Sequence, residues 1–320
     1  MNIDNNTIIE WAVQWPKGPL TKAAYDVCAA DPDVIVLAAD LAKALGVDSA
    51  EAFEGQYYNV GIAEQNMMGI ACGLALEGKT PVATSFTPFL TLRACEQIRT
   101  SVCYMDLNVK MIGSNAGVRG GKAGTSHYGL EDISVMRSFP NMVVLSPCDG
   151  LSLYKSILAM MEHKGPAYVR VAGVPEMRII YDKDYDFVIG KAIRLVEGAD
   201  VAILATGPMV AKAQDAMEIL KDKGIKPTLY DFQTIKPLDT EVVREVSNNY
   251  KLVVTIEENT IIGGFCSAVA EEMAQYGGGA KLRILGLQDK FMKIGSYEAQ
   301  LRKCGLMPDQ IAAVIEEALA

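Results

Sequence analysis

The sequence has little that would hold a metal ion or a nucleic acid. Only two histidines occur in 320 residues, His127 and His163, which argues against a histidine-rich metal site. The seven cysteines are scattered, with no C-x-x-C pair, and are typical of buried free thiols in a reducing cytoplasm. A net charge of −9 and a pI of about 4.9 argue against binding to nucleic acids or anionic membranes.

Long apolar runs are also missing. No stretch reaches the ~18 residues that a membrane span requires, and no basic-then-apolar leader opens the chain. We therefore expect no membrane association and a cytoplasmic location.

What the sequence does contain is an alternation of short β-branched runs and helical runs. Apolar strands separated by helices indicate a parallel sheet covered on both faces. We therefore expect an α/β fold with two domains, each a mostly parallel sheet covered by helices, over residues 1–175 and 191–320. A charged segment over 176–190 is predicted to link them. The predicted strands cover 34–39, 57–62, 80–86, 109–113, 142–145, 167–171, 201–206, 228–232, 252–257 and 282–287. The predicted helices cover 21–30, 64–76, 90–104, 131–138, 150–163, 210–223, 239–249, 263–276 and 308–319.

A single carboxylate, Glu64, stands where the run 57–62 gives way to an apolar helix over 64–76. Ligands bind at this carboxyl edge of parallel sheets. Acids at helix starts are common on surfaces, where the helix dipole stabilises them by ~0.3–1 kcal/mol. The apolar neighbours of Glu64 favour instead a buried carboxylate that needs a hydrogen-bond donor. Such an acid can exchange a proton with a heterocyclic nitrogen.

The segment "VGIAEQNMMGIACGLALEGKTPVATSF", residues 60–86, resembles the pyrimidine-binding domain of thiamine diphosphate-dependent enzymes of the transketolase family. The resemblance continues through "RACEQIRTSV", "GTSHYGLEDISVMRSFPNMVVLSPCD" and "VVTIEENTIIGGFCSAVAEEMA" and covers nearly the whole chain. It is closest to the carboxy-terminal subunit of split bacterial transketolases. The resemblance implies transfer of a two-carbon ketol unit from a ketose to an aldose, with thiamine diphosphate as cofactor.

The resemblance also implies roles for individual residues. Glu64 would contact N1′ of the cofactor's pyrimidine ring and share a proton with it. Phe86 and Phe89 would lie against that ring, with ~0.5–1.5 kcal/mol from stacking, and Asp40 would lie near the cofactor. His127 would line the substrate channel, so we predict Glu64 and His127 as catalytic residues. Without the resemblance, the two phenylalanines would be read as core residues and Asp40 as a helix cap.

Residues 114–129 contain five glycines in sixteen positions, which favours a close-fitting ligand loop or a flexible surface loop. Arg119 and Lys122 add positive charge that could hold a phosphate, sulfonate or carboxylate, or could simply be solvated. We predict that Asn115, Arg119, Lys122 and His127 bind a ketose that carries an anionic group.

Several family positions are occupied by other residues. Asn115 and Ala116 replace a His–Asp pair, and Ala123 replaces an acid that reads donor hydroxyls. Ser146 replaces an arginine that binds the substrate phosphate, and Leu92 replaces a third aromatic residue. These departures weaken the case for the usual sugar phosphates more than the case for ketol transfer.

The family's metal motif, "GDG" followed by "NN", has no counterpart, since the chain contains no "GDG". We therefore predict that an amino-terminal partner subunit carries the Mg²⁺ and diphosphate site. The cofactor would lie at the interface of an α₂β₂ assembly with a homodimer contact. The stretches 69–78 and 92–105 are candidates for that interface, or for burial within the subunit. Three alternatives stay open: the beta subunit of a 2-oxo acid dehydrogenase, a 1-deoxyxylulose-5-phosphate synthase-like enzyme, and a non-catalytic subunit.

Overall fold

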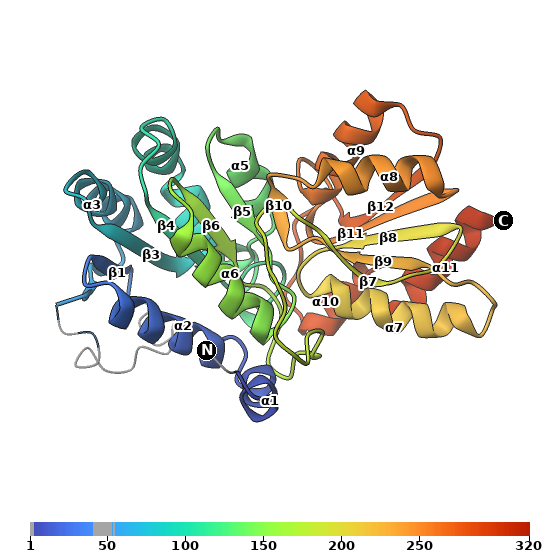
Figure 1. The fold of residues 1–320 in the computed structure, drawn as a ribbon, viewed down its shortest axis with the longest axis horizontal. Coiled ribbons are helices and arrows are strands. Elements are labelled where there is room, and N and C mark those ends of the chain that lie inside the picture. The colour runs from blue at the N-terminus through green and yellow to red at the C-terminus, as the bar shows by residue number, and fades with distance from the viewer. Residues whose placement is uncertain (1–2, 41–52, 54) are drawn as a thin grey trace.

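The computed structural model contains two sheets side by side, each covered by helices on both faces (Figure 1). The structure describes residues 3–40, 53 and 55–320. Both sheets are parallel except for one edge strand each. The predicted α/β fold with two helix-covered, mostly parallel sheets is therefore confirmed.

The first sheet has seven strands in the order β10-β5-β6-β4-β3-β1-β2. Strand β1 reads "VIVLA" and is buried along its whole length, as expected of a strand covered on both faces. The strands are β1 (Val34–Ala38), β2 (Tyr57–Asn59), β3 (Thr80–Phe86), β4 (Lys110–Ser114), β5 (Val143–Leu145), β6 (Ala167–Arg170) and β10 (Thr234–Lys236).

Two helical layers cover this sheet. One contains α1 (Asn5–Val13), α2 (Lys17–Ala30) and α6 (Gly150–Glu162), and the other contains α3 (Glu64–Leu76) and α5 (Asp132–Ser138) (Figure 1). Asp149 caps α6, because its side chain accepts a hydrogen bond from the Ser152 N–H at 2.8 Å. Residues 64–76 form the helix that the sequence predicts.

The predicted helix over 90–104 is not a regular α-helix. It consists of a π-helical turn η3 (Phe89–Arg93), a short α4 (Cys95–Gln97) and a second π-helical segment η4 (Ile98–Cys103). The predicted strand over 57–62 also ends early, at Asn59. Such π-helical turns are rare and frequently mark functional sites.

The second sheet has five strands in the order β12-β11-β8-β9-β7. Its strands are β7 (Ile193–Val196), β8 (Val201–Ala205), β9 (Thr228–Asp231), β11 (Leu252–Thr260) and β12 (Lys281–Leu287). Its helices are α7 (Met209–Lys221), α8 (Thr240–Asn249), α9 (Phe265–Tyr276), α10 (Tyr297–Lys303) and α11 (Pro308–Leu319). Residues 171–192, which contain no helix or strand, lead from β6 to β7.

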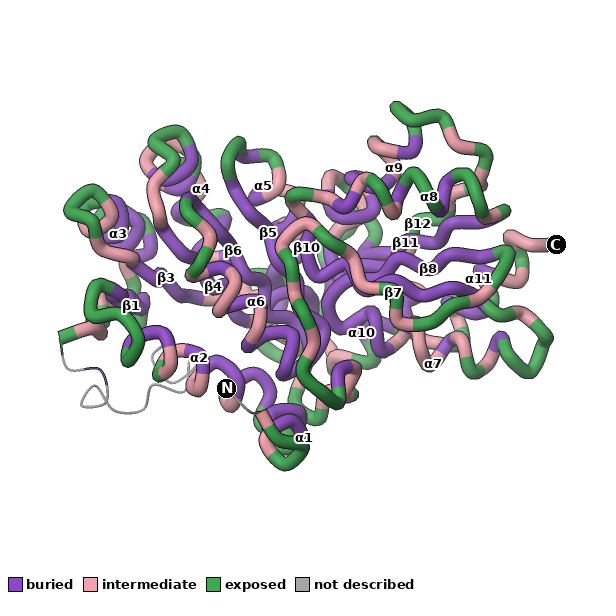
Figure 2. Tube along the Cα trace, viewed as in Figure 1, coloured by how far each residue is buried: buried purple, intermediate pink, exposed green. Residues whose placement is uncertain are grey.

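Strand β10 connects the two sheets. It follows β9 in the chain but pairs antiparallel with β5, so that Thr234 lies opposite Leu145. Buried residues run along the strands of both sheets and across the junction between them (Figure 2). The two apolar clusters of the core each contain residues from both sheets, so the halves pack as one body.

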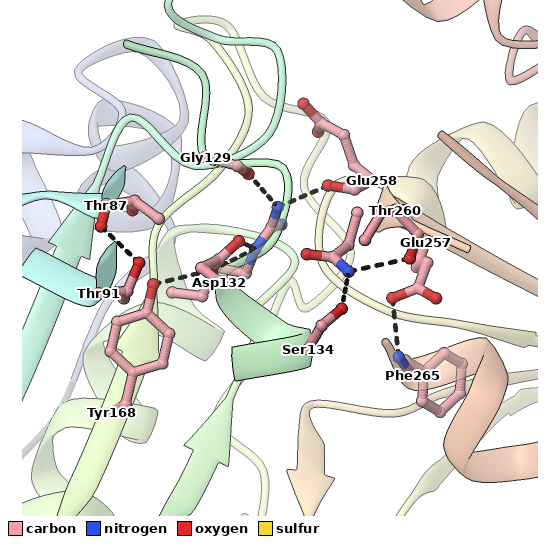
Figure 3. A network of polar contacts seen from close by, with 12 residues as sticks. Thr87, Thr91, Gly129, Asp132, Ser134, Tyr168, Glu257, Glu258, Thr260 and Phe265 are labelled. Carbon is pink, nitrogen blue, oxygen red and sulfur yellow. Dashed lines mark hydrogen bonds and ion pairs between the residues drawn. The ribbon is translucent and has the colours of Figure 1, made fainter. Parts of the chain in front are cut away.

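A buried ion pair reinforces this junction. Arg170 on β6 contacts Asp132 at the start of α5, with Nε 2.9 Å from Oδ2, and both side chains are about 99% buried. The Arg170 guanidinium also donates a 2.5 Å hydrogen bond to the carbonyl of Glu258 on β11, and Tyr168 donates to Asp132 at 2.8 Å (Figure 3). Burial raises the pKa of the Tyr168 hydroxyl, and the Asp132 charge adds to this effect.

Candidate active site

Glu64, the first residue of α3, is a buried carboxylate, with only 1% of its surface exposed. Oε1 accepts a hydrogen bond from Ser85 Oγ on β3 at 3.1 Å. Oε2 lies 2.6 Å from an Nη of Arg93 in η3. Both oxygens are therefore paired, as a buried carboxylate requires.

Three aromatic rings gather at the carboxyl end of β3. Phe86 ends that strand, Phe89 begins η3, and His127 lies in a 3₁₀ turn, η6 (Thr125–His127), of the glycine-rich loop. The ring of His127 lies 5.2 Å from that of Phe89 and 6.0 Å from that of Phe86, centroid to centroid. The structure thus brings together three residues that the sequence predicts for cofactor or substrate contact.

Arg93 links Glu64 to these rings and is not among the site residues that the sequence predicts. Its guanidinium carbon lies 4.4 Å from the centroid of Phe89, a cation–π distance. The spacing of Phe89 and Arg93 in "FLTLR" holds a weak signal, because residues four apart share one face of a helix. The partnership with Glu64 depends on tertiary structure and has no local signal.

Asp40 lies at the carboxyl end of β1 and is exposed. Its backbone has a φ of 58°, and its N–H donates to Asn59 Oδ1 at 3.1 Å. Burial raises the pKa of the neighbouring Tyr57 hydroxyl, and the Asp40 charge raises it further. Asp40 therefore shares the carboxyl edge of the sheet with Glu64, and its contact with a cofactor stays a prediction.

The glycine-rich loop is held in place by the second domain. Val118 N–H donates to Glu258 Oε1 at 2.8 Å, and Tyr297 donates to the other oxygen of Glu258 at 2.6 Å. A Cβ on Gly117, which has a φ of 66°, would lie 2.0 Å from Glu258 Oε1, so glycine is required there. Burial raises the pKa of Glu258, against the lowering effect of Arg170. These contacts join the loop to the second domain.

The predicted substrate-binding residues occupy different positions in this loop. Asn115 is half-buried with a φ of 57°, and Lys122 is exposed. Arg119 is half-buried and donates to the carbonyl of Gly173 at 2.7 Å. Burial lowers the pKa of Arg119, although Tyr297 and Glu258 act in the opposite direction. Arg119 is thus anchored at one nitrogen, and its part in substrate binding stays a prediction.

Ser146 does not provide a binding group for an anion. Ser146 is 1% exposed, and its backbone N–H donates to the carbonyl of Gln233 at 2.7 Å. A Cβ on Gly207 would lie 2.8 Å from Ser146 Oγ, so the side chain is enclosed at the junction of the sheets. Any anion on the substrate must be held by other groups.

The residues around Glu64 fit the pyrimidine half of thiamine diphosphate. They offer a buried carboxylate for a ring nitrogen and phenyl rings for a flat heterocycle. The planar guanidinium of Arg93 already shows that a flat, N–H-bearing group fits between them. No group of three or more His, Cys, Asp or Glu that could hold a metal ion occurs among the described residues.

Two exposed apolar side chains lie close to this site in the chain. Ile62 is 74% exposed and Leu92 is 44% exposed, and they flank Glu64 and Arg93 in the chain. On α3, Met67 and Met68 face the core, whereas Gly69 is exposed with open space around it. The stretches 69–78 and 92–105 therefore contribute to both the core and an outer apolar face.

Comparisons with known proteins identify both halves of the chain. Residues 16–172 match the family "Transketolase, pyrimidine binding domain", and residues 190–311 match "Transketolase, C-terminal domain". A protein of Methanocaldococcus jannaschii named for a transketolase C-terminal section is 41% identical over 288 residues, 89% of this chain and 90% of that protein. The 6-deoxy-6-sulfo-D-fructose transketolase subunit SqwH of Clostridium sp. strain MSTE9 is 38% identical over 95% of this chain and 94% of that protein.

A solved structure gives the same result. The structure described as "Split gene transketolase, inactive beta4 tetramer" is 37% identical, with a TM-score of 0.84 over 94% of this chain and 96% of that chain. The 1-deoxy-D-xylulose-5-phosphate synthase of Caldanaerobacter subterraneus is 34% identical over 92% of this chain but only 47% of that protein. The split proteins therefore match from end to end, and the synthase matches over about half its length.

Proposed function

Because this chain belongs to the transketolase family, we propose that it is the carboxy-terminal subunit of a two-subunit, thiamine diphosphate-dependent transketolase. It moves a two-carbon ketol unit from a ketose that carries an anionic group to an aldose. The observation that carries this proposal is the cluster of a buried carboxylate, Glu64, with the rings of Phe86, Phe89 and His127.

Each residue of the cluster has a distinct role. Thiamine diphosphate, when bound, supplies the nucleophilic carbon and the electron sink that cleavage of a carbon–carbon bond requires. Glu64 holds a proton against the pyrimidine N1′, and Ser85 fixes the orientation of its carboxylate. Phe86 and Phe89 support the ring and exclude water. His127 can donate and accept hydrogen bonds with the hydroxyls of the sugar.

The diphosphate and its Mg²⁺ are held by an amino-terminal partner subunit, in an α₂β₂ assembly with a homodimer contact. A hard cation needs several oxygen ligands, and the described residues contain no group of three or more His, Cys, Asp or Glu that could hold a metal ion. The exposed Ile62 and Leu92 extend the site into a surface that the partner covers. The similar split transketolase, described as an inactive β4 tetramer, supports dependence on a partner.

The anion of the substrate is held by the glycine-rich loop. Lys122 is exposed, Arg119 is half-buried and donates one hydrogen bond to the carbonyl of Gly173, and Ser146 offers no charge. The relative SqwH, whose name specifies a sulfonated fructose, supports an anionic ketose.

None of the described helices is long and apolar enough to cross a membrane. All seven cysteines are free, which supports a reducing, cytoplasmic environment.

The test is an assay of the assembled enzyme. The chain and the partner encoded in the same genome are co-expressed, supplied with thiamine diphosphate and Mg²⁺, and assayed for ketol transfer with phosphorylated and sulfonated ketoses. We expect Glu64→Gln to lower kcat by about 10²–10⁴-fold, the range for loss of a proton-transfer group. The isolated chain is expected to be inactive. Equal activity of the variant, or turnover by the chain alone, would contradict the proposal.

A second candidate is synthesis of 1-deoxyxylulose 5-phosphate, which the 34% identity to such a synthase favours. The same assembly distinguishes the two. Release of CO₂ from pyruvate in the presence of glyceraldehyde 3-phosphate would identify the synthase reaction, and ketol transfer without it would identify a transketolase.

A further inference from the structure

Arg93 makes the two contacts that the proposed pyrimidine ring would make. One Nη lies 2.6 Å from Glu64 Oε2, and the guanidinium carbon lies 4.4 Å from the centroid of Phe89. A guanidinium is flat and delocalised and carries N–H donors in its plane. A pyrimidine ring with a proton on N1′ is also flat and would donate to the same carboxylate while lying on the same phenyl ring.

We propose that Arg93 is a resident substitute for the pyrimidine ring, an inference that rests on the proposed function. It pairs with Glu64 while the chain is without cofactor. It leaves both Glu64 and Phe89 when the ring enters, because a ring that lies on Phe89 and donates to Glu64 would occupy the space that the guanidinium fills.

The burial of Glu64 explains why a substitute is needed. The carboxylate is 1% exposed, and Ser85 supplies a donor to Oε1 only. Without Arg93, Oε2 would be a buried charged atom with no described donor, which is strongly unfavourable. Arg93 therefore keeps the site folded and closed before the cofactor binds.

The exposure of Arg93 explains why it can leave. Its side chain is 43% exposed, and within the described part of the chain its only ion pair is with Glu64. The guanidinium side of the pair is partly hydrated already, and the guanidinium regains the rest of its hydration when it turns outward. Glu64 by contrast cannot move, because it is fixed at the start of α3 and bonded to Ser85 on β3.

Competition of this kind raises the apparent dissociation constant of the cofactor. The apparent constant equals the intrinsic constant divided by the fraction of molecules in which Arg93 has left the site. Arg93→Met keeps most of the side-chain length and removes the cation. In the assembled enzyme we expect this variant to bind thiamine diphosphate about 3- to 10-fold more tightly than wild type, measured by calorimetric titration with Mg²⁺ present. Arg244→Met serves as the matched control and should leave the affinity unchanged, because Arg244 on α8 also pairs with a glutamate, Glu272, and lies over an aromatic ring, that of Tyr276, but belongs to the second sheet.

Thermal unfolding of the isolated chain gives a readout that does not involve the cofactor. Arg93→Met should lower the melting temperature in the wild-type background. It should have little effect in a Glu64→Gln background, where no buried charge is left unpaired.

Three results would overturn the inference. If Arg93→Met bound thiamine diphosphate more weakly than wild type, Arg93 would be a contact of the bound ring. If the affinity were unchanged, Arg93 would not compete with the ring. Additive effects in the unfolding experiment would remove the coupling to Glu64. A wild-type assembly that binds no thiamine diphosphate would instead overturn the proposed function and this inference with it.

Discussion

Asp231, the last residue of β9, is a carboxyl group buried between the two sheets. Its Oδ2 accepts hydrogen bonds from Tyr181 at 2.8 Å, Gln233 at 3.0 Å and the Cys148 thiol at 3.3 Å. Burial raises the pKa of Asp231 to about 7, although these donors lower it. The folded protein therefore keeps a proton on Asp231 up to near neutral pH, whereas the unfolded chain releases it near pH 4.

This difference predicts that Asp231 makes the protein less stable as pH rises. The contribution is fully present below about pH 4 and is lost as pH rises through about 7, by about 4 kcal/mol at most. Asp231→Asn cannot ionise and lacks this dependence. Urea unfolding of both proteins from pH 5 to 8 should show wild type losing stability relative to the variant. Parallel curves would show that Asp231 does not titrate in this range.

At the scale of single residues, the sequence predicts which residues are buried at the site better than it predicts which side chains they contact. The apolar neighbours of Glu64 indicate a buried carboxylate, and the structure buries it. The donors Ser85 and Arg93 come from β3 and η3, and no local pattern predicts which side chains of a different element will face an acid. The assignments of Asp40 and Asn115 depend on the resemblance to a family, and those of Arg119 and Lys122 depend on the positive charge of the loop; all four stay predictions.

At the scale of elements, the Asp132–Arg170 ion pair joins α5, β6, the glycine-rich loop and β11. Removing one partner leaves the other as an unpaired buried charge. Asp132→Asn is therefore expected to lower the free energy of unfolding by about 3–5 kcal/mol, measured by urea denaturation. Asp309→Asn removes one partner of the exposed pair with Arg302 and should cost less than about 1 kcal/mol. Equal costs for the two variants would refute the proposed role of the buried pair.

The alternation of apolar strands and helices predicts most elements and the parallel sheets, because burial on both faces leaves an apolar run in the inner strands. It does not predict β10. That strand has only three residues, too few to show an alternation of apolar and polar positions, and it pairs with β5, which is far away in the sequence. It also does not predict the π-helical turns over 89–103, because periodicity over so few residues cannot separate a wider turn from an α-helix.

At the scale of the whole molecule, the exposed apolar side chains that neighbour Glu64 in the chain predict an assembly. Ile62 is 74% exposed and lies two residues before Glu64 in the chain. Ile62→Asp should weaken association with the partner subunit at least 10-fold, because a buried charge at an interface is costly, and should leave the stability of the isolated chain within about 0.5 kcal/mol. Analytical ultracentrifugation of the mixed subunits measures the association.

Val188→Asp provides the control for this prediction. Val188 is also largely exposed, at 58%, but lies in the segment 171–192 that leads from β6 to β7 in the chain. It should leave the association unchanged. Full association of the Ile62 variant would mean that the partner covers a different surface.

The most direct test of the account is the structure of the chain bound to its partner subunit, thiamine diphosphate and Mg²⁺. We predict the Glu64 carboxylate within hydrogen-bonding distance of the pyrimidine N1′, the ring against Phe89, and the metal ion bound by the partner alone. A structure with Glu64 still paired to Arg93 and the cofactor elsewhere would contradict it.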